Sequence, residues 1–136
     1  MQPWFHSWAF NRARTPEEAT SMHPWIKPHW DMIPEDTEVL LTHGPPFGIG
    51  DQVLRFVRGE YEPEYVGCKE LTKRIVETQV KLHVFGHIHE GRGTEYKGPV
   101  TYVNASSLTE FYNPADTRPI RVIREVFQDG SIGYVV

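Results

Sequence analysis

The stretch His83-Val-Phe-Gly-His-Ile-His-Glu-Gly91 decides the fold that we expect for this chain. The run from Leu82 to Phe85, which begins one residue before this stretch, is apolar and predicts a short strand that ends at Gly86. Two histidines follow, His87 and His89, with one apolar residue between them. In extended backbone, residues two apart point to the same side, so both imidazoles can face one point. Gly86 would let the backbone approach a ligand closely and adopt an unusual conformation.

A second predicted strand, Glu38 to Thr42, also ends in a histidine, His43. Gly44-Pro45-Pro46 follows, and proline cannot donate to a sheet, so the chain leaves the sheet there. Ligands of open α/β sheets bind at the carboxyl ends of the strands, and neutral imidazole is a common ligand of divalent metals. We therefore expect His43, His87 and His89 to converge on a metal site. The alternative is a pair of solvated polar residues at a strand end.

Two of these motifs carry a resemblance to a known family. Thr-His-Gly-Pro-Pro (42–46) and Phe-Gly-His-Ile-His (85–89) resemble the last two metal motifs of the calcineurin-like metallophosphoesterase superfamily. Further segments resemble its metallophosphoesterase domain-containing branch, and the resemblance covers most of the chain. These segments are Gln2-Pro-Trp-Phe5, the Gly-Pro-Pro-x-Gly loop (44–48), Val66-Gly-Cys68, residues 82–91 and Thr101-Tyr-Val-Asn-Ala-Ser106.

The resemblance implies a four-layer α/β/β/α sandwich and a site with two divalent ions, which could be manganese, iron or zinc. By motif match, His43 and His87 would bind the second metal and His89 the first. Glu90 would accept a hydrogen bond from an imidazole N–H, or else be a solvated charge. The reaction implied is the hydrolysis of a small phosphodiester or phosphomonoester, and no catalytic residue is assigned.

The other motifs of this family do not occur in the sequence. An Asp-x-His motif, a Gly-Asp motif and a Gly-Asn-His-Asp/Glu motif should precede Thr42, and Gly50-Asp51 has the right letters only after His43. We therefore interpret residues 1–136 as the C-terminal portion of a single phosphoesterase domain. Without bridging carboxylates, two divalent ions about 4 Å apart repel each other strongly, so we expect at most one metal in this chain alone.

Three functions stay open on this basis. The first is a metallophosphoesterase that needs the N-terminal half, supplied by the natural chain or by a partner. The second is a non-enzymatic remnant or interaction module with a partial three-histidine metal site. The third is a mononuclear metal hydrolase, in which three histidines and a water hold one ion.

Composition narrows the class of protein. The chain has 136 residues, 39% of them hydrophobic and 24% charged, which suits one globular domain. The formal net charge is −4, whereas surfaces that bind nucleic acids are basic, so we do not expect a nucleic-acid partner. Residues 1–30 contain no signal pattern and no 18-residue apolar run, so we expect a cytoplasmic protein without a membrane span. The single cysteine, Cys68, is expected in the core, on a helix.

The remaining elements are predicted from periodicity and turn residues. Residues 67–79 have helical spacing and would connect the strands 38–42 and 81–85 in a βαβ unit. Hairpins are expected at 94–104 and at 120–136, the latter around Asp129-Gly130. A short helical run carrying Leu54 and Val57 is expected after a capping Asp51.

The first 35 residues are rich in aromatic residues and histidine. Thr15-Pro-Glu-Glu18 predicts a helix start. His6, His23 and His29 show no ligand spacing and are expected at the surface or in packing. Half a domain would leave a sheet edge and the cluster of Trp4, Phe5 and Trp8 exposed, so we expect self-association or binding of the complementing half.

Overall fold

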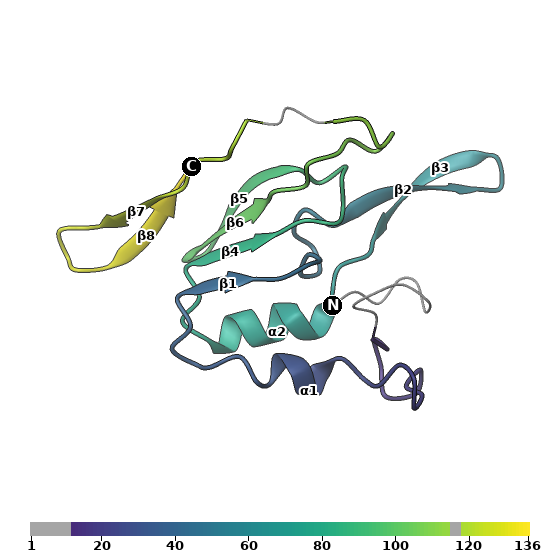
Figure 1. Cartoon of the computed structure of the whole chain (residues 1–136), viewed down its shortest axis with the longest axis horizontal. Coiled ribbons are helices and arrows are strands. Elements are labelled where there is room, and N and C mark those ends of the chain that lie inside the picture. The colour runs from purple at the N-terminus through teal and green to yellow at the C-terminus, as the bar shows by residue number, and fades with distance from the viewer. Residues whose placement is uncertain (1–11, 115–117) are drawn as a thin grey trace.

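A four-stranded sheet in the order β1-β4-β6-β5 is the centre of the chain. The computed structural model describes residues 12–114 and 118–136 (Figure 1). Strands β1 (Val39–Leu41), β4 (Leu82–Phe85) and β6 (Val100–Asn104) run parallel, and β5 (Gly93–Lys97) pairs antiparallel with β6. The predicted strands at 38–42 and 82–85 are therefore confirmed as neighbours, and so is the hairpin at 94–104.

Two helices cover one face of this sheet. Helix α2 (Lys69–Glu77) connects β1 to β4 through the βαβ arrangement predicted from the sequence, and α1 (Lys27–Trp30) lies beside it (Figure 1). The side chains buried between sheet and helices form the main core: Ile26, Trp30, Leu40, Leu71, Ile75, Phe85, Val100 and Tyr102. Cys68 is buried there as predicted, but it precedes α2 and accepts a hydrogen bond from the Trp30 indole.

The other face of the sheet packs against a C-terminal hairpin. This hairpin consists of β7 (Ile123–Val126) and β8 (Ile132–Val135), joined by the predicted Asp129-Gly130 turn. Leu82, Val103 and Tyr134 form a second small core between them. Beside this core, the Glu38 carboxylate accepts hydrogen bonds from Arg124 and from the Tyr134 hydroxyl, which lower its pKa to about 2.

The segment after His43 is a β-hairpin and not the predicted helical run. Strands β2 (Gln52–Val57) and β3 (Glu60–Tyr65) pair antiparallel and project from the main sheet (Figure 1). The turn is two residues long, and Arg58 and Gly59 both have positive φ, 50° and 96°, as the favoured hairpin turn requires. Leu54 pairs with Pro63 and Phe56 with Tyr61, so alternating β-prone residues override the weaker helical spacing.

The predicted helix start at Thr15 is also wrong. The Thr15 hydroxyl does accept a hydrogen bond from the Glu18 N–H, at 3.4 Å, but the chain makes only a turn there. The exposed residues that follow offer no apolar face that could pack a helix, and short helices depend on such packing. Trp4, Phe5, Trp8 and His6 lie outside the described residues. His29 accepts a hydrogen bond from Arg12, and His23 is partly exposed, in keeping with packing or surface positions.

The fold class is thus α/β, with a mixed sheet and few helices. In the described part of the chain, no helix combines the length and the apolar character needed to cross a membrane.

One histidine lies inside the fold. His83, on β4, is 0% exposed. The Thr42 hydroxyl donates to the Gly44 carbonyl, so it must accept from His83 Nε2–H, 2.8 Å away. His83 Nδ1 then has no hydrogen-bond partner, and burial lowers the His83 pKa to about 3. A neutral histidine therefore ties β4 to the loop that carries His43.

We expect the free energy of unfolding to fall on acidification because of His83. Its pKa is about 6.5 in an unfolded chain and about 3 in the fold, so its contribution is full above pH 6.5 and is lost as the pH drops toward 3. The slope is up to about 1.4 kcal/mol per pH unit for one such group. Urea unfolding at pH 7, 6 and 5 measures it.

The test variant is His83→Leu. It should reduce the slope, and the slope that remains comes from groups such as His87, whose pKa burial also lowers. Equal slopes for wild type and His83→Leu would contradict this account of His83.

Candidate metal centre

The pairing of β1 with β4 brings two of the predicted histidines together. The ladder continues past both strands, because Thr42 N–H donates to the Val84 carbonyl and Gly86 N–H to the His43 carbonyl, at 3.1 and 3.0 Å. The rings of His43 and His87 then lie with their centroids 4.8 Å apart, tilted by 41°. The predicted meeting of strand-end histidines is therefore observed for this pair.

His87 reaches that position through a strained turn and not through an extended strand. Its φ is +71°, and Ile88 N–H donates to the Gly86 carbonyl at 2.8 Å, which closes a three-residue turn around His87. The expected alternation along an extended backbone is thus wrong for His87 and His89. Gly86 keeps φ outside the positive range, so the unusual conformation expected there falls on His87. Such strain costs about 1–3 kcal/mol and is typical of functional sites.

Both rings of the pair are held neutral. Burial lowers the pKa of His87 to about 4, with further lowering by the neighbouring positive charges that His43 and His89 would carry. Burial also lowers the pKa of His43. A neutral imidazole has a nitrogen lone pair to offer, which a protonated one lacks. The pair is therefore in the protonation state that a metal ligand requires.

His89 is oriented by a loop that the sequence analysis did not single out. Its Nδ1 lies 3.0 Å from the Thr109 carbonyl, which can only accept, so Nδ1 carries a proton and donates a hydrogen bond to that carbonyl. The Tyr112 ring meets the His89 ring edge-on, with centroids 5.1 Å apart. For His89, the Thr109 carbonyl occupies the orienting role that was expected of Glu90. A carbonyl leaves no signal in the sequence, so this partner could not have been found there.

The three imidazoles could form part of a metal site. Two rings are in contact, the third is close enough for its charge to affect His87, and all three are donors suited to borderline divalent ions. Within residues 12–114 and 118–136, no group of three or more His, Cys, Asp or Glu side chains is placed to hold one ion. The described residues thus do not assemble the three-ligand set of a mononuclear hydrolase.

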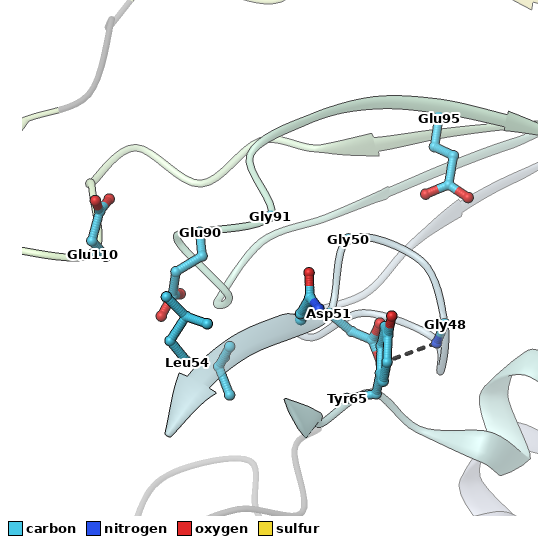
Figure 2. Close-up of a pocket in the computed structure, with 11 residues that line it drawn as sticks. Gly48, Gly50, Asp51, Leu54, Tyr65, Glu90, Gly91, Glu95 and Glu110 are labelled. Atoms are coloured by element: carbon cyan, nitrogen blue, oxygen red, sulfur yellow. Dashed lines mark hydrogen bonds between the residues drawn. The ribbon is translucent and has the colours of Figure 1, made fainter. Parts of the chain in front are cut away.

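An acidic cavity adjoins the histidine-bearing loop. It measures about 630 Å³, and Glu90 and Glu110, the neighbours of His89 and Thr109 in the chain, both line it. In Figure 2 these two side chains lie on the left, whereas Glu95 lies at the upper right. Asp51 also lines the cavity, and no lysine or arginine is among its lining residues.

Asp51 stabilises the loop below this cavity and does not cap a helix. It is 1% exposed, and its Oδ2 accepts a hydrogen bond from the Gly48 N–H at 3.0 Å (Figure 2) and another from the Gly67 N–H at 2.9 Å. The loop packs tightly on the histidine segment, since a Cβ on Gly91 would lie 2.1 Å from the Gly50 carbonyl oxygen. Glycine at position 91 is therefore required for this approach.

Comparison with known proteins identifies relatives. Metallophosphoesterase domain-containing protein 1 of Homo sapiens and that of Mus musculus are each 41% identical to the chain over 116 residues. The match covers 85% of this chain and 31% of each relative. A UPF0046 protein of Caenorhabditis elegans is 38% identical over 91 residues, covering 67% of this chain and 28% of its own length. No protein-family model matches.

The chain thus spans just under a third of the length of the mammalian relatives it matches. Their identity extends over most of the chain, including the region of the three histidines expected from the motifs. These homologues support assigning the chain to a metallophosphoesterase branch.

Proposed function

We propose that this chain supplies the histidine side of a metal-dependent phosphoesterase site, within a domain of the four-layer sandwich type. The observation that carries the proposal is the contact of two neutral imidazoles, His43 and His87, at the carboxyl ends of adjacent parallel strands. Neither ring belongs to the hydrophobic core. His87 is half-buried and loses hydration at a cost, which metal ligation would offset.

His43 and His87 would hold a divalent ion, which could be manganese, iron or zinc, and His89 would bind the other ion of the complete site. When bound, such an ion supplies a Lewis acid and lowers the pKa of a coordinated water. The chain's own contribution is to keep His43 and His87 neutral through burial and to orient His89 through the Thr109 carbonyl. Three neutral ligands offset none of an ion's charge, so one ion is the most this chain would hold alone.

The acidic cavity limits where a phosphoester could lie. Asp51, Glu90, Glu95 and Glu110 line it, and a phosphate group carries the same sign of charge. We therefore propose that a small phosphoester substrate binds at the histidine edge and that its phosphate stays out of the cavity. Carboxylates beside the histidines would instead favour the approach of a cation.

An interaction module is the second candidate, and a specific observation favours it. On one face of the β2–β3 hairpin, Leu54, Phe56 and Tyr61 are 63%, 63% and 70% exposed. Strand β1 also pairs only with β4 among the described strands, and Leu41 on it is 73% exposed. Exposed apolar surface and an open strand edge are features of proteins that associate.

We expect the chain to bind one divalent ion through the histidines. Titration of zinc or manganese into the purified chain, followed by calorimetry, should give a stoichiometry of one. His87→Ala should weaken binding by about tenfold or more, because removal of a ligand costs at least as much as removal of its orienting partner. His23→Ala, a histidine outside the site, should bind as the wild type does. Equal affinities for these two variants would refute the assignment.

The chain alone should hydrolyse bis-p-nitrophenyl phosphate little or not at all with manganese. The reason is that no carboxylate accompanies the histidine pair in a metal-holding group among the described residues. Co-expression with the remainder of the mammalian relative should raise the rate, and His87→Ala should abolish the gain. Robust turnover by the chain alone, lost in His87→Ala, would show that the histidine site suffices.

We also propose that the open edge of β1 pairs with another strand, from a complementing half of the domain or from a second copy. Light scattering on dilute protein should show species larger than a monomer. Leu41→Lys should shift the distribution toward monomer, because a charge on an edge strand opposes pairing. The control is Val76→Lys, at an exposed apolar position of α2 away from the edge. A cooperatively unfolding monomer at micromolar concentration would refute pairing with a second copy.

A further inference from the structure

The carbonyl of Ile88, between His87 and His89, is held by a side chain from another strand. Asn104 ends β6, opposite Phe85 at the end of β4, and its Nδ2 donates to the Ile88 carbonyl at 2.7 Å. The hydroxyl of Ser106 also lies within hydrogen-bond distance of this carbonyl, at 3.2 Å. Asn104 and Ser106 are 1% and 5% exposed, so water does not compete for these contacts.

The Asn104 amide uses all of its hydrogen-bonding capacity. Its Oδ1 accepts from the N–H and the hydroxyl of Ser106, at 3.0 and 2.7 Å. Its second N–H donates to the Gly50 carbonyl at 3.2 Å. Because Oδ1 faces a backbone donor and Nδ2 faces two carbonyls, only one orientation of the amide satisfies the network. Asn104 therefore joins β6, the Gly50 loop and the histidine segment in one buried network.

This network bears on the strained conformation of His87. The N–H of Ile88 is already fixed by the Gly86 carbonyl, so Asn104 fixes the other polar group of the same residue. With both groups held, the peptide planes on either side of Ile88 have little freedom, and they set the directions of the His87 and His89 side chains. A left-handed non-glycine residue persists only where its surroundings over-determine it.

We infer that Asn104, supported by Ser106, is a positioning residue for the two histidines of the 87–89 segment. This inference rests on the proposed function for its metal readout. It assigns Asn104 no contact with metal or substrate. Its side chain acts through the Ile88 carbonyl.

The test compares Asn104→Asp, Ser106→Ala and a control, Thr101→Val. Aspartate has the size of asparagine and keeps the oxygen that accepts from Ser106. It replaces the NH2 group that donates to the Ile88 carbonyl with a second oxygen. Thr101 lies on the same strand and donates a buried hydrogen bond to the Tyr134 carbonyl, on the opposite face of the sheet. Its removal destabilises the same strand without touching the histidine segment.

Two readouts are made on each folded variant: zinc affinity by calorimetry, and the imidazole nitrogen signals by NMR of 15N-labelled protein without metal. Asn104→Asp should weaken zinc binding by about 10–100-fold, the usual effect of losing a partner that orients a ligand, and Ser106→Ala by a smaller factor. Both should shift the signals of His87 and His89. Thr101→Val should lower the melting temperature and change neither readout.

The NMR readout separates this inference from the proposed function. If the wild type binds no zinc, the proposed function fails, while shifted His87 and His89 signals in Asn104→Asp still support the positioning role. If Asn104→Asp or, where that variant does not fold, Ser106→Ala leaves both signals unchanged, the positioning role is overturned. Weaker zinc binding by Thr101→Val to the same extent would also overturn it, because loss of stability would then explain the effect.

Discussion

The parallel pairing of β4 with β1 on one side and β6 on the other is the constraint on which the site depends. Parallel strands in register end at the same edge, so the residues that follow them meet there. His43 follows β1, His87 follows β4 and Asn104 ends β6. The cores on the two faces of the sheet keep this register, because a slip of one residue would turn Leu82 and His83 to the wrong faces.

Local sequence patterns sufficed to predict the elements that are marked by apolar runs, helical spacing or turn residues. The apolar runs before His43 and His87, the helical spacing after Cys68 and the Asp129-Gly130 turn each predicted an element that the structure contains. The contact of His43 with His87 was predictable for the same reason, since two strands ending in histidine need only be parallel neighbours to bring them together.

The remaining features could not be predicted because they depend on partners distant in sequence. The positive φ of His87 lies in a turn whose next residue, Ile88, is held from β6 by Asn104, a partner distant in sequence. The Thr109 carbonyl that orients His89 is a backbone group, which any residue type carries. The β2–β3 hairpin was mistaken for a helix because Leu54 and Val57 fit a helical spacing, whereas the cross-strand pairs that stabilise the hairpin, such as Phe56 with Tyr61, are visible only once it is paired.

Three departures from local preference lie near one edge of the sheet. His87 has a strained backbone, partial burial lowers the pKa of His43 and His87, and the neighbouring cavity is lined by acids without a basic residue. Each feature alone lowers stability, and a sequence shaped only for stability would not collect them in one place. A divalent cation would offset the partial burial of the imidazoles and the clustering of the acids. The neutral imidazoles would coordinate it, and the nearby carboxylates would gain a counter-charge. The hydrogen bonds of Asn104 concern the strained backbone of His87, since they hold the carbonyl of Ile88, the next residue, and that of Gly50 in the adjoining loop.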